Sequence, residues 1–227
     1  MLTKIRVVTS LLLVLLMFGL FQAFSGAVFF SALSDDKTSF NVSQLASKNL
    51  QALNDAYMSL NQSRVVLTRI QLRIANSKVD GNTPDIASLF TDSQHFQQVA
   101  ATNFDLFKTT PDTPGQDAAL NNRLMDAYGA YATALTQLQA ALQANNLVEA
   151  GKAPVAPNQN AFLQIYTDWR ANQAHLSELG VEKNASAYTR MLWILGTIMA
   201  LVVVVIALCW IGLRRVLINP LNANIAH

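Results

Sequence analysis

The chain has 227 residues, of which 52% are hydrophobic and 13% are charged, and its mean hydropathy is positive. This balance is typical of a membrane-associated protein rather than of a soluble globule. The single cysteine, Cys209, excludes an intramolecular disulfide, and no basic tract with interleaved aromatic residues indicates a nucleic-acid partner.

The first predicted element is a membrane-spanning helix over residues 7–33. No charged residue occurs between Val7 and Phe30, and a helix of that length covers roughly 35 Å, which is enough to cross a bilayer. A secretory signal peptide is the competing interpretation, because Lys4 and Arg6 precede the apolar run. The uncharged stretch is longer than the usual signal-peptide core of about 7 to 15 residues, so we expect a span.

Four helical stretches with short turns between them are predicted for residues 34–190. The first covers residues 34–77 and ends at Asp80-Gly81-Asn82. Large aliphatic residues recur along it at intervals of seven, which is typical of a helix packed against a partner: Leu53, Leu60, Leu67 and Ile74.

The second and third helices are predicted to begin at Thr83-Pro84 and at Thr113-Pro114, because threonine can cap a helix and proline suits its first position. The second is expected to end before Pro111 and the third at Asn145-Asn146. A loop over residues 150–158 then leads into the fourth helix.

The fourth helix is expected to continue into a second membrane span over residues 191–213, which contains no charged residue. Trp193 and Trp210 lie near opposite ends of this span, where indole rings prefer the headgroup layer. Both are therefore predicted to be membrane anchors.

The charged residues outside the segment from Ser34 to Arg190 are all basic and predict the orientation: Lys4, Arg6, Arg214 and Arg215. Short flanks rich in Lys and Arg stay in the cytoplasm. We therefore predict that residues 1–6 and 214–227 are cytoplasmic, with Arg214 and Arg215 as further anchors. Residues 34–190 are expected outside the membrane.

Together these elements predict an all-α fold, in which an up-and-down four-helix bundle stands on two transmembrane helices. The middle of the first helix is interrupted by arginines and polar residues. Part of its surface is therefore expected to meet a second copy of the chain, which predicts a homodimer.

Three arginines of the first helix form the candidate binding site: Arg64, Arg69 and Arg73. Ordinary solvated arginines are the alternative interpretation. A helix stabilised by ion pairs would place acidic residues three or four positions away, but none occurs between Asp55 and Asp80. This pattern favours an anion site, because a guanidinium binds a carboxylate bidentately and stays charged.

Helix geometry indicates that two copies share this site. Residues advance by about 100° each, so Arg73 points about 180° away from Arg64, whereas Thr68 lies about 40° from Arg64 and Arg69 about 40° from Arg73. If two copies meet about a twofold axis, Arg64 and Thr68 of one copy can face Arg69 and Arg73 of the other.

The loop over residues 150–158 is expected to form the other wall of this site. Counting about 1.5 Å per residue places Arg69 and Pro154 at similar heights above the membrane, roughly 58 and 55 Å. Lys152 could then add a fourth cation.

Several segments resemble bacterial methyl-accepting chemotaxis receptors of the enteric serine and aspartate type, along nearly the whole length of the chain. They are Ile5-Arg6-Val7-Val8-Thr9, Ser25-Gly26 with Phe29-Phe30, Gln62-Ser63 followed by the Arg64, Arg69 and Arg73 spacing, and Arg214-Arg215 with Pro220-Leu221. The resemblance implies a chemoreceptor of the bacterial inner membrane with its bundle in the periplasm. It also implies that the three arginines contact the ligand's carboxylate groups across a dimer interface.

The chain departs from the amino-acid-sensing members in the loop before the fourth helix. Those members carry Pro-Thr where this chain has Pro154-Val155. Val155 thus takes a ligand-binding position without a hydroxyl, and Lys152 would repel an ammonium group. A dicarboxylate, a tricarboxylate or another organic acid becomes an alternative to serine or aspartate, bound directly or through a periplasmic binding protein.

Receptors of this kind continue past the Pro-Leu pair into a linker and a cytoplasmic signalling domain, whereas this sequence stops at His227. We expect residues 214–227 to be the start of a truncated HAMP-like linker, and signalling to need full-length chemoreceptors. A sensor module of a histidine kinase or cyclase and a two-span protein-interaction anchor are the alternatives. An enzyme, a cofactor or a metal site is not expected, because the three histidines are scattered and neither metal-ligand spacing nor a nucleophile motif occurs.

Overall fold

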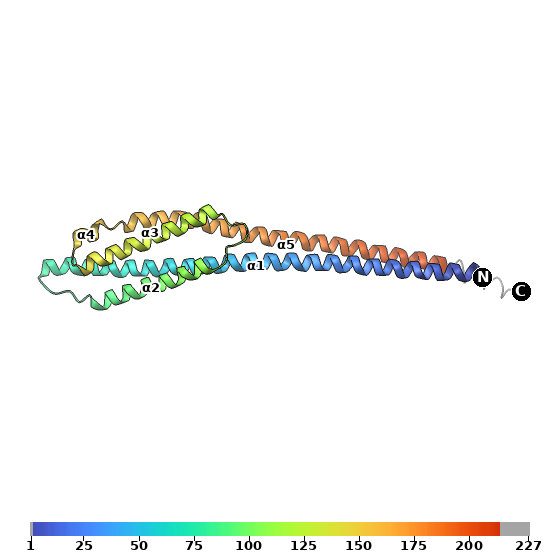
Figure 1. The fold of residues 1–227 in the computed structure, drawn as a ribbon, viewed down its shortest axis with the longest axis horizontal. Helices are drawn as coiled ribbons and strands as arrows, with labels where there is room; N and C mark the ends of the chain where they lie inside the picture. Colours follow the sequence, from blue (N-terminus) through green and yellow to red (C-terminus); the bar gives the residue numbers. More distant parts are fainter. Residues whose placement is uncertain (1, 214–227) are drawn as a thin grey trace. The chain divides into compact units, whose positions relative to one another are not determined.

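The structure, a computed structural model, describes residues 2–213, with side chains described for residues 14–208, 210 and 211. Arg214 and Arg215 lie outside the described residues. The described part contains no strand and consists of five helices joined by short links (Figure 1). They are α1 (Leu2–Asp80), α2 (Ala87–Thr109), α3 (Ala118–Gln143), α4 (Leu147–Lys152) and α5 (Val155–Leu213). The predicted all-α class is confirmed.

The chain divides into two compact units. We call the residues from Phe40 to Gly180 the bundle unit, and the residues up to Ser39 and from Val181 onward the apolar unit. Both α1 and α5 contribute residues to each unit.

The bundle unit is an up-and-down four-helix bundle made by α2, α3 and the adjoining parts of α1 and α5. The α1–α2 link and the short helix α4 lie at one end of it, and the α2–α3 link lies at the other (Figure 1). Successive long helices therefore alternate in direction, as short connections require.

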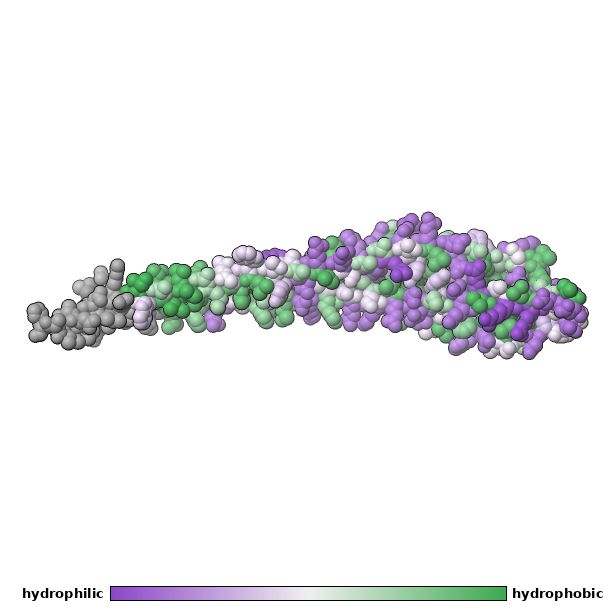
Figure 2. Space-filling view, turned by 180° about the vertical axis from the view of Figure 1, so that it is seen from behind, coloured by the Kyte–Doolittle hydropathy of each residue, from purple (hydrophilic) through white to green (hydrophobic). Residues whose placement is uncertain are grey.

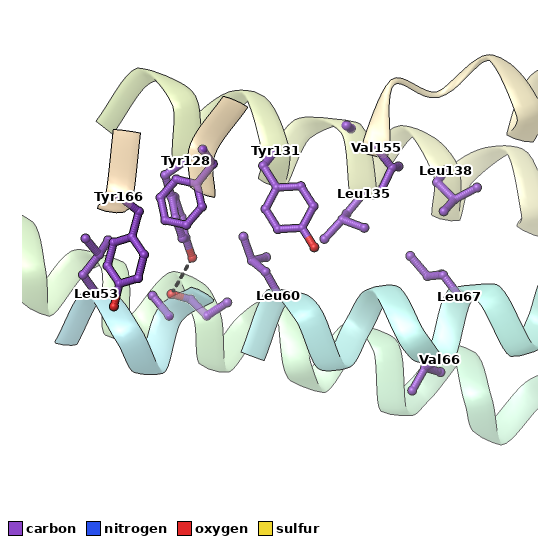
Figure 3. Packing of buried hydrophobic residues seen from close by; sticks show 14 of the residues in the cluster. Leu53, Leu60, Val66, Leu67, Tyr128, Tyr131, Leu135, Leu138, Val155 and Tyr166 are labelled. Atoms are coloured by element: carbon purple, nitrogen blue, oxygen red, sulfur yellow. Dashed lines mark hydrogen bonds between the residues drawn. The ribbon is translucent and has the colours of Figure 1, made fainter. Parts of the chain in front are cut away.

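The leucine and isoleucine positions that recur every seven residues along α1 form the centre of the core. Leu53, Leu60, Leu67 and Ile74 are each at most 2% exposed. They pack against α3 and α5 of the same chain, as Figure 3 shows for Leu53, Leu60 and Leu67. Full burial of such a side chain stabilises the fold by roughly 1.5–3 kcal/mol. The seven-residue pattern thus belongs to the internal packing of one chain.

The predicted first residues of α2 and α3 were wrong by three and four residues, respectively. Residues 82–86 are irregular, and α2 begins only at Ala87. Thr113 does not cap α3, because its hydroxyl donates a hydrogen bond to Gln173 Oε1 at 2.6 Å. Gly115, with φ of +85°, turns the chain instead, and the Asp117 side chain accepts from the backbone N–H of Leu120. The Thr113 side chain therefore forms a tertiary hydrogen bond, and Asp117 caps the helix in its place.

The predicted loop over residues 150–158 was also wrong in most of its length. The Asn146 side chain accepts from the backbone N–H of Glu149 and caps α4. After a break at Ala153 and Pro154, α5 begins at Val155. Pro157 is accommodated in the first turn of α5, where backbone N–H groups have no intrahelical acceptor.

The apolar unit carries two helical segments that are long and apolar enough to cross a membrane. Those of its side chains that the structure describes are mostly exposed, including Trp193 at 75% and Trp210 at 63%. Figure 2 shows hydrophobic residues over the apolar unit and a largely hydrophilic surface over the bundle unit. Within the apolar unit, Asn184 Nδ2 donates to Asp36 Oδ1 at 2.6 Å, which ties the two helices together beside the apolar segments.

Candidate carboxylate-binding site

Arg64 is the most enclosed of the three candidate arginines and leaves α1 on the face that turns toward α3 and α5. It is half-buried, whereas Arg69 and Arg73 are exposed. Tyr57 and Asn61, which precede Arg64 by seven and three positions, lie on nearly the same face. Both accept hydrogen bonds from the Gln159 amide of α5, at 3.1 and 3.2 Å.

The opposite face of α1 carries Arg73. Its guanidinium donates to the backbone carbonyl of Asp85, in the link before α2. Arg69 lies on the exposed surface near this face. Within the described residues, Arg64, Arg69 and Arg73 form no ion pair. Their role in binding an anion stays a prediction.

Thr68 follows Arg64 by one turn and is exposed. Its hydroxyl donates to the backbone carbonyl of Arg64 at 2.9 Å, a common arrangement for a helical threonine. The hydroxyl oxygen keeps its lone pairs on the surface, where it can accept a hydrogen bond from a ligand.

An apolar stripe separates the two arginine faces of α1. It consists of four large hydrophobic residues spaced by seven, which are 47%, 48%, 59% and 85% exposed: Met58, Val65, Leu72 and Val79. On a helical projection, Val65 and Leu72 point about 80–100° away from Arg64, roughly midway between Arg64 and Arg73. This second seven-residue pattern was missed in the sequence, because the first, buried pattern accounts for the same helix.

The register between α1 and α5 places Val155 at the height of Arg64. Three hydrogen bonds show which residues of the two antiparallel helices lie opposite each other. Gln159 of α5 bonds to Tyr57 and Asn61 of α1, and Ser177 of α5 bonds to Ser43 of α1. Continuing this register by one turn brings Val155 opposite about residues 61–65. Val155 is buried at 8% exposure, so its side chain belongs to the packed floor beside Arg64.

Lys152 lies at the end of α4 and is exposed. Its ammonium group forms a salt bridge with Glu149 at 2.5 Å, three residues earlier. Such an exposed pair contributes at most about 1 kcal/mol. The role of Lys152 at the anion site stays a prediction. The Glu149 carboxylate offsets part of its charge.

A closed ring of polar side chains lies in the core directly beside Arg64. Ser63 and Ser93 share a hydrogen bond of 2.9 Å, Ser93 donates to Gln139 Oε1, and the Gln97 amide donates to both Ser63 and Gln139. Ser63 and Ser93 are fully buried. The ring joins α1, α2 and α3 at one height and fixes their register, because sliding any helix would leave buried polar groups without partners.

Sequence reasoning also missed Tyr131 of α3, which is fully buried near Arg64. Burial raises the pKa of the Tyr131 phenol, and the positive charge of Arg64 acts in the opposite direction. The spacing of hydrophobic residues along α3 is typical of a core position for Tyr131, but it gives no sign of a charged neighbour on another helix.

The fold defines a class of protein: an all-helical bundle with two helical segments long and apolar enough to cross a membrane, an arrangement typical of membrane receptors. A sequence model of the Tar ligand-binding domain homologue family matches residues 1–178. The chain belongs to this family. The resemblance to enteric chemoreceptors predicted from the arginine spacing and the flanking motifs is thereby confirmed.

Known relatives are chemotaxis transducers. The chain is 32% identical over 223 residues to methyl-accepting chemotaxis protein I of Escherichia coli K12, which covers 98% of this chain and 40% of that protein. It is 28% identical over 225 residues to the methyl-accepting chemotaxis citrate transducer of Salmonella typhimurium, covering 99% and 41%. It is 27% identical over 232 residues to the methyl-accepting chemotaxis aspartate transducer of Klebsiella aerogenes, covering 100% and 42%. The chain thus spans about two fifths of the length of these relatives.

Proposed function

We propose that this chain is the sensing part of a transmembrane chemoreceptor that binds a small carboxylate at a site shared by two copies. The observation that carries this proposal is the position of the apolar stripe between two faces of arginines that form no ion pair within the described residues. Exposed hydrophobic residues or exposed arginines alone are common on protein surfaces. An apolar stripe with arginines on both sides is what we expect of an interface with cations along both edges.

The apolar stripe supports the dimer part of the proposal. Four large hydrophobic side chains spaced by seven residues form the kind of seam that pairs helices side by side. The bundle's own core already uses the other seven-residue pattern of α1, so the stripe is left for a second copy. Burial of each such side chain contributes roughly 1.5–3 kcal/mol at most, less the part that is already shielded in one copy.

Twofold symmetry then brings the two arginine faces together. With the stripes in contact, Arg64 and Thr68 of one copy lie across the seam from Arg69 and Arg73 of the other. Two equivalent sites follow for each dimer. Three guanidinium groups converging on one place suit a carboxylate, because each can make two parallel charge-assisted hydrogen bonds.

The wall of the site near α5 favours an organic acid over an amino acid. Val155 offers no hydroxyl there and is itself packed in the core. Lys152 adds positive charge nearby, which would oppose the ammonium group of an amino acid. A relative named for citrate and a relative named for aspartate both belong to the comparison, so both kinds of carboxylate are candidates.

The proposed topology is that of a two-span protein of the inner membrane. Residues 7–33 and 191–213 cross it, residues 34–190 lie in the periplasm, and residues 1–6 and 214–227 lie in the cytoplasm. In this arrangement α5 contains both the start of the site wall and the second span. A ligand that favours one packing of the dimer over another would shift α5 and carry the signal inward.

A ligand screen on the full chain in lipid nanodiscs tests the proposal. Thermal unfolding would be followed with L-serine, L-aspartate, malate and citrate, and any stabilising compound would be titrated by calorimetry. We expect at least one carboxylate to bind, and we expect Arg64→Ala, Arg69→Ala and Arg73→Ala each to weaken it by roughly 10–150-fold, the loss of about 1.5–3 kcal/mol for a hydrogen bond to a charged group. Arg123→Ala, which removes an exposed arginine from α3, is the matched control. Binding that tolerates all three substitutions would overturn the proposed site.

A further inference from the structure

Tyr131 differs from the other core tyrosines in the state of its hydroxyl group. Tyr128 donates to the carbonyl of Ala100 at 3.3 Å, Tyr166 donates to Asn54 Oδ1 at 3.4 Å, and Tyr57 accepts from Gln159. The Tyr131 hydroxyl is buried and has no hydrogen-bond partner among the described residues. A buried hydroxyl without a partner is unfavourable, so an explanation for its presence is needed.

The Tyr131 hydroxyl points to the part of α1 that carries Arg64. In Figure 3 the ring extends from α3 toward α1, and its oxygen lies between Leu60 and Leu67 in the direction along α1. Arg64 occupies the middle of that interval. The rings of Tyr131 and Tyr57 have centroids 6.4 Å apart, and Tyr57 and Arg64 leave α1 within about 20° of each other. The phenol and the guanidinium therefore share one side of α1.

The hydrogen-bonding needs of the two groups are complementary. The guanidinium of Arg64 has five N–H donors, none of which forms a hydrogen bond within the described part of the chain. A bidentate carboxylate would engage two of them. Other donors are then left over, and the phenol oxygen of Tyr131 offers lone pairs that can accept from them. The effect of the Arg64 charge on the Tyr131 pKa, opposite to that of burial, agrees with this proximity.

We propose that Tyr131 is a positioning residue for the ligand-binding arginine: when a carboxylate binds, the Tyr131 hydroxyl oxygen accepts a hydrogen bond from Arg64 and orients the guanidinium toward the ligand. The inference rests on the proposed function and adds a residue from the interior of the bundle to it. The phenol stays neutral throughout and no proton is transferred. Its contribution is to restrict a flexible side chain to the orientation that binds a carboxylate with two parallel bonds.

Substitution of Tyr131 by phenylalanine removes only the oxygen. In the full chain in nanodiscs, we expect Tyr131→Phe to weaken binding of the carboxylate found among L-serine, L-aspartate, malate and citrate by roughly 5–20-fold. This is less than the loss expected for an arginine substitution, because Tyr131 acts on the ligand only through Arg64. Without ligand, the melting temperature should stay the same or rise, because in that state the buried hydroxyl has no partner. Tyr128→Phe is the matched control on the same helix: it should lower the melting temperature and leave affinity within twofold.

Two further measurements separate positioning from a structural effect. In an Arg64→Ala background, Tyr131→Phe should cause no additional loss of affinity, because the group that it orients is absent. Ligand addition to the wild type should also change the near-ultraviolet absorption of tyrosine, and this change should persist in Tyr128→Phe and disappear in Tyr131→Phe.

The outcomes distinguish this inference from the proposed function. If a carboxylate binds in an Arg64-dependent way and Tyr131→Phe leaves both affinity and the tyrosine signal unchanged, the positioning role is wrong and the proposed function stands. If none of the four compounds binds the wild type, the proposed function fails and the positioning role fails with it.

Discussion

The side-chain oxygens of Ser63 and Ser93 lie 2.9 Å apart in the bundle interior and join α1 to α2 one residue before Arg64. Both serines are fully buried, and the ring that they form with two glutamines satisfies each donor that points inward. A polar ring in this place fixes helix register more strictly than aliphatic packing would, since each member must keep its own partner. The register in turn sets the height of Arg64 against its neighbours.

Ser63→Ala should therefore lower the free energy of unfolding by about 1–3 kcal/mol, because the hydroxyl of Ser93 and the amide of Gln97 lose a buried partner. Thermal or chemical unfolding followed by circular dichroism measures the change. Ser59→Ala is the control. Within the part of the chain that the structure describes, its hydroxyl bonds only to the Asp55 carbonyl of its own helix, so the loss should be smaller. Equal losses for the two variants would show that the ring contributes nothing beyond ordinary packing.

The apolar stripe predicts the oligomeric state. Leu72→Lys places a positive charge at the proposed seam, close to the same charge of the second copy, and we expect it to convert dimers to monomers. Leu106→Lys introduces the same charge at a position on α2 that is 55% exposed and should leave dimers intact. Analytical ultracentrifugation in detergent decides the outcome. A monomeric wild type, or a dimeric Leu72→Lys variant, would argue against this interface.

A shared site predicts complementation between two inactive copies. Arg64→Ala and Arg73→Ala should each abolish high-affinity binding in their own homodimers. In a mixed dimer, one of the two sites retains Arg64 from one copy and Arg73 from the other, so binding should return with one site per dimer. Calorimetry on dimers purified with two different affinity tags gives the stoichiometry. No recovery in the mixed dimer would place both arginines in a site within one chain.

The buried tyrosines predict how stability depends on pH. Burial raises the pKa of Tyr128, Tyr131 and Tyr166 above the ordinary value of about 10. In the unfolded chain these phenols lose their protons near pH 10, whereas in the folded chain they keep them. Stability should thus be unaffected by these groups up to about pH 9.5 and fall above pH 10, by up to about 1.4 kcal/mol per pH unit for each tyrosine.

Melting temperatures at pH 8.0, 9.5, 10.5 and 11.0 measure this dependence. Tyr128→Phe and Tyr131→Phe should each reduce the slope above pH 10, because each removes one titrating group. A melting temperature that stays constant up to pH 11 would contradict the predicted effect of burial.

The proposed topology is open to labelling. In a Cys209→Ser background, Val148→Cys on α4, where valine is 72% exposed, should react with a membrane-impermeant maleimide added to intact spheroplasts. Thr3→Cys should react only after the membrane is permeabilised. The reverse pattern would invert the proposed orientation.

The sequence by itself predicted the helical bundle, the two apolar helices and the family, because each depends on signals carried by neighbouring residues. Helical periodicity identifies core positions such as Leu53 and Leu67, and long uncharged runs identify segments able to cross a membrane. The three arginines were visible for the same reason, as a local charge pattern without nearby acids. The helix starts at Thr83 and Thr113 were predicted wrongly. At Thr113 the reason is a hydrogen bond between its hydroxyl and Gln173, sixty residues away, which the local sequence does not indicate.

Only the tertiary structure decided which of the two seven-residue patterns of α1 is internal and which is left exposed. Both patterns are apolar, and a single helix gives no information about which face its neighbours cover. The same holds for Tyr131, whose place beside Arg64 depends on the register between α3 and α1, and for the polar ring, whose members are dispersed over 77 positions of the chain from Ser63 to Gln139. Periodicity assigns residues to faces of one helix, but contacts between helices depend on rotation and register, which the packing of the whole bundle determines.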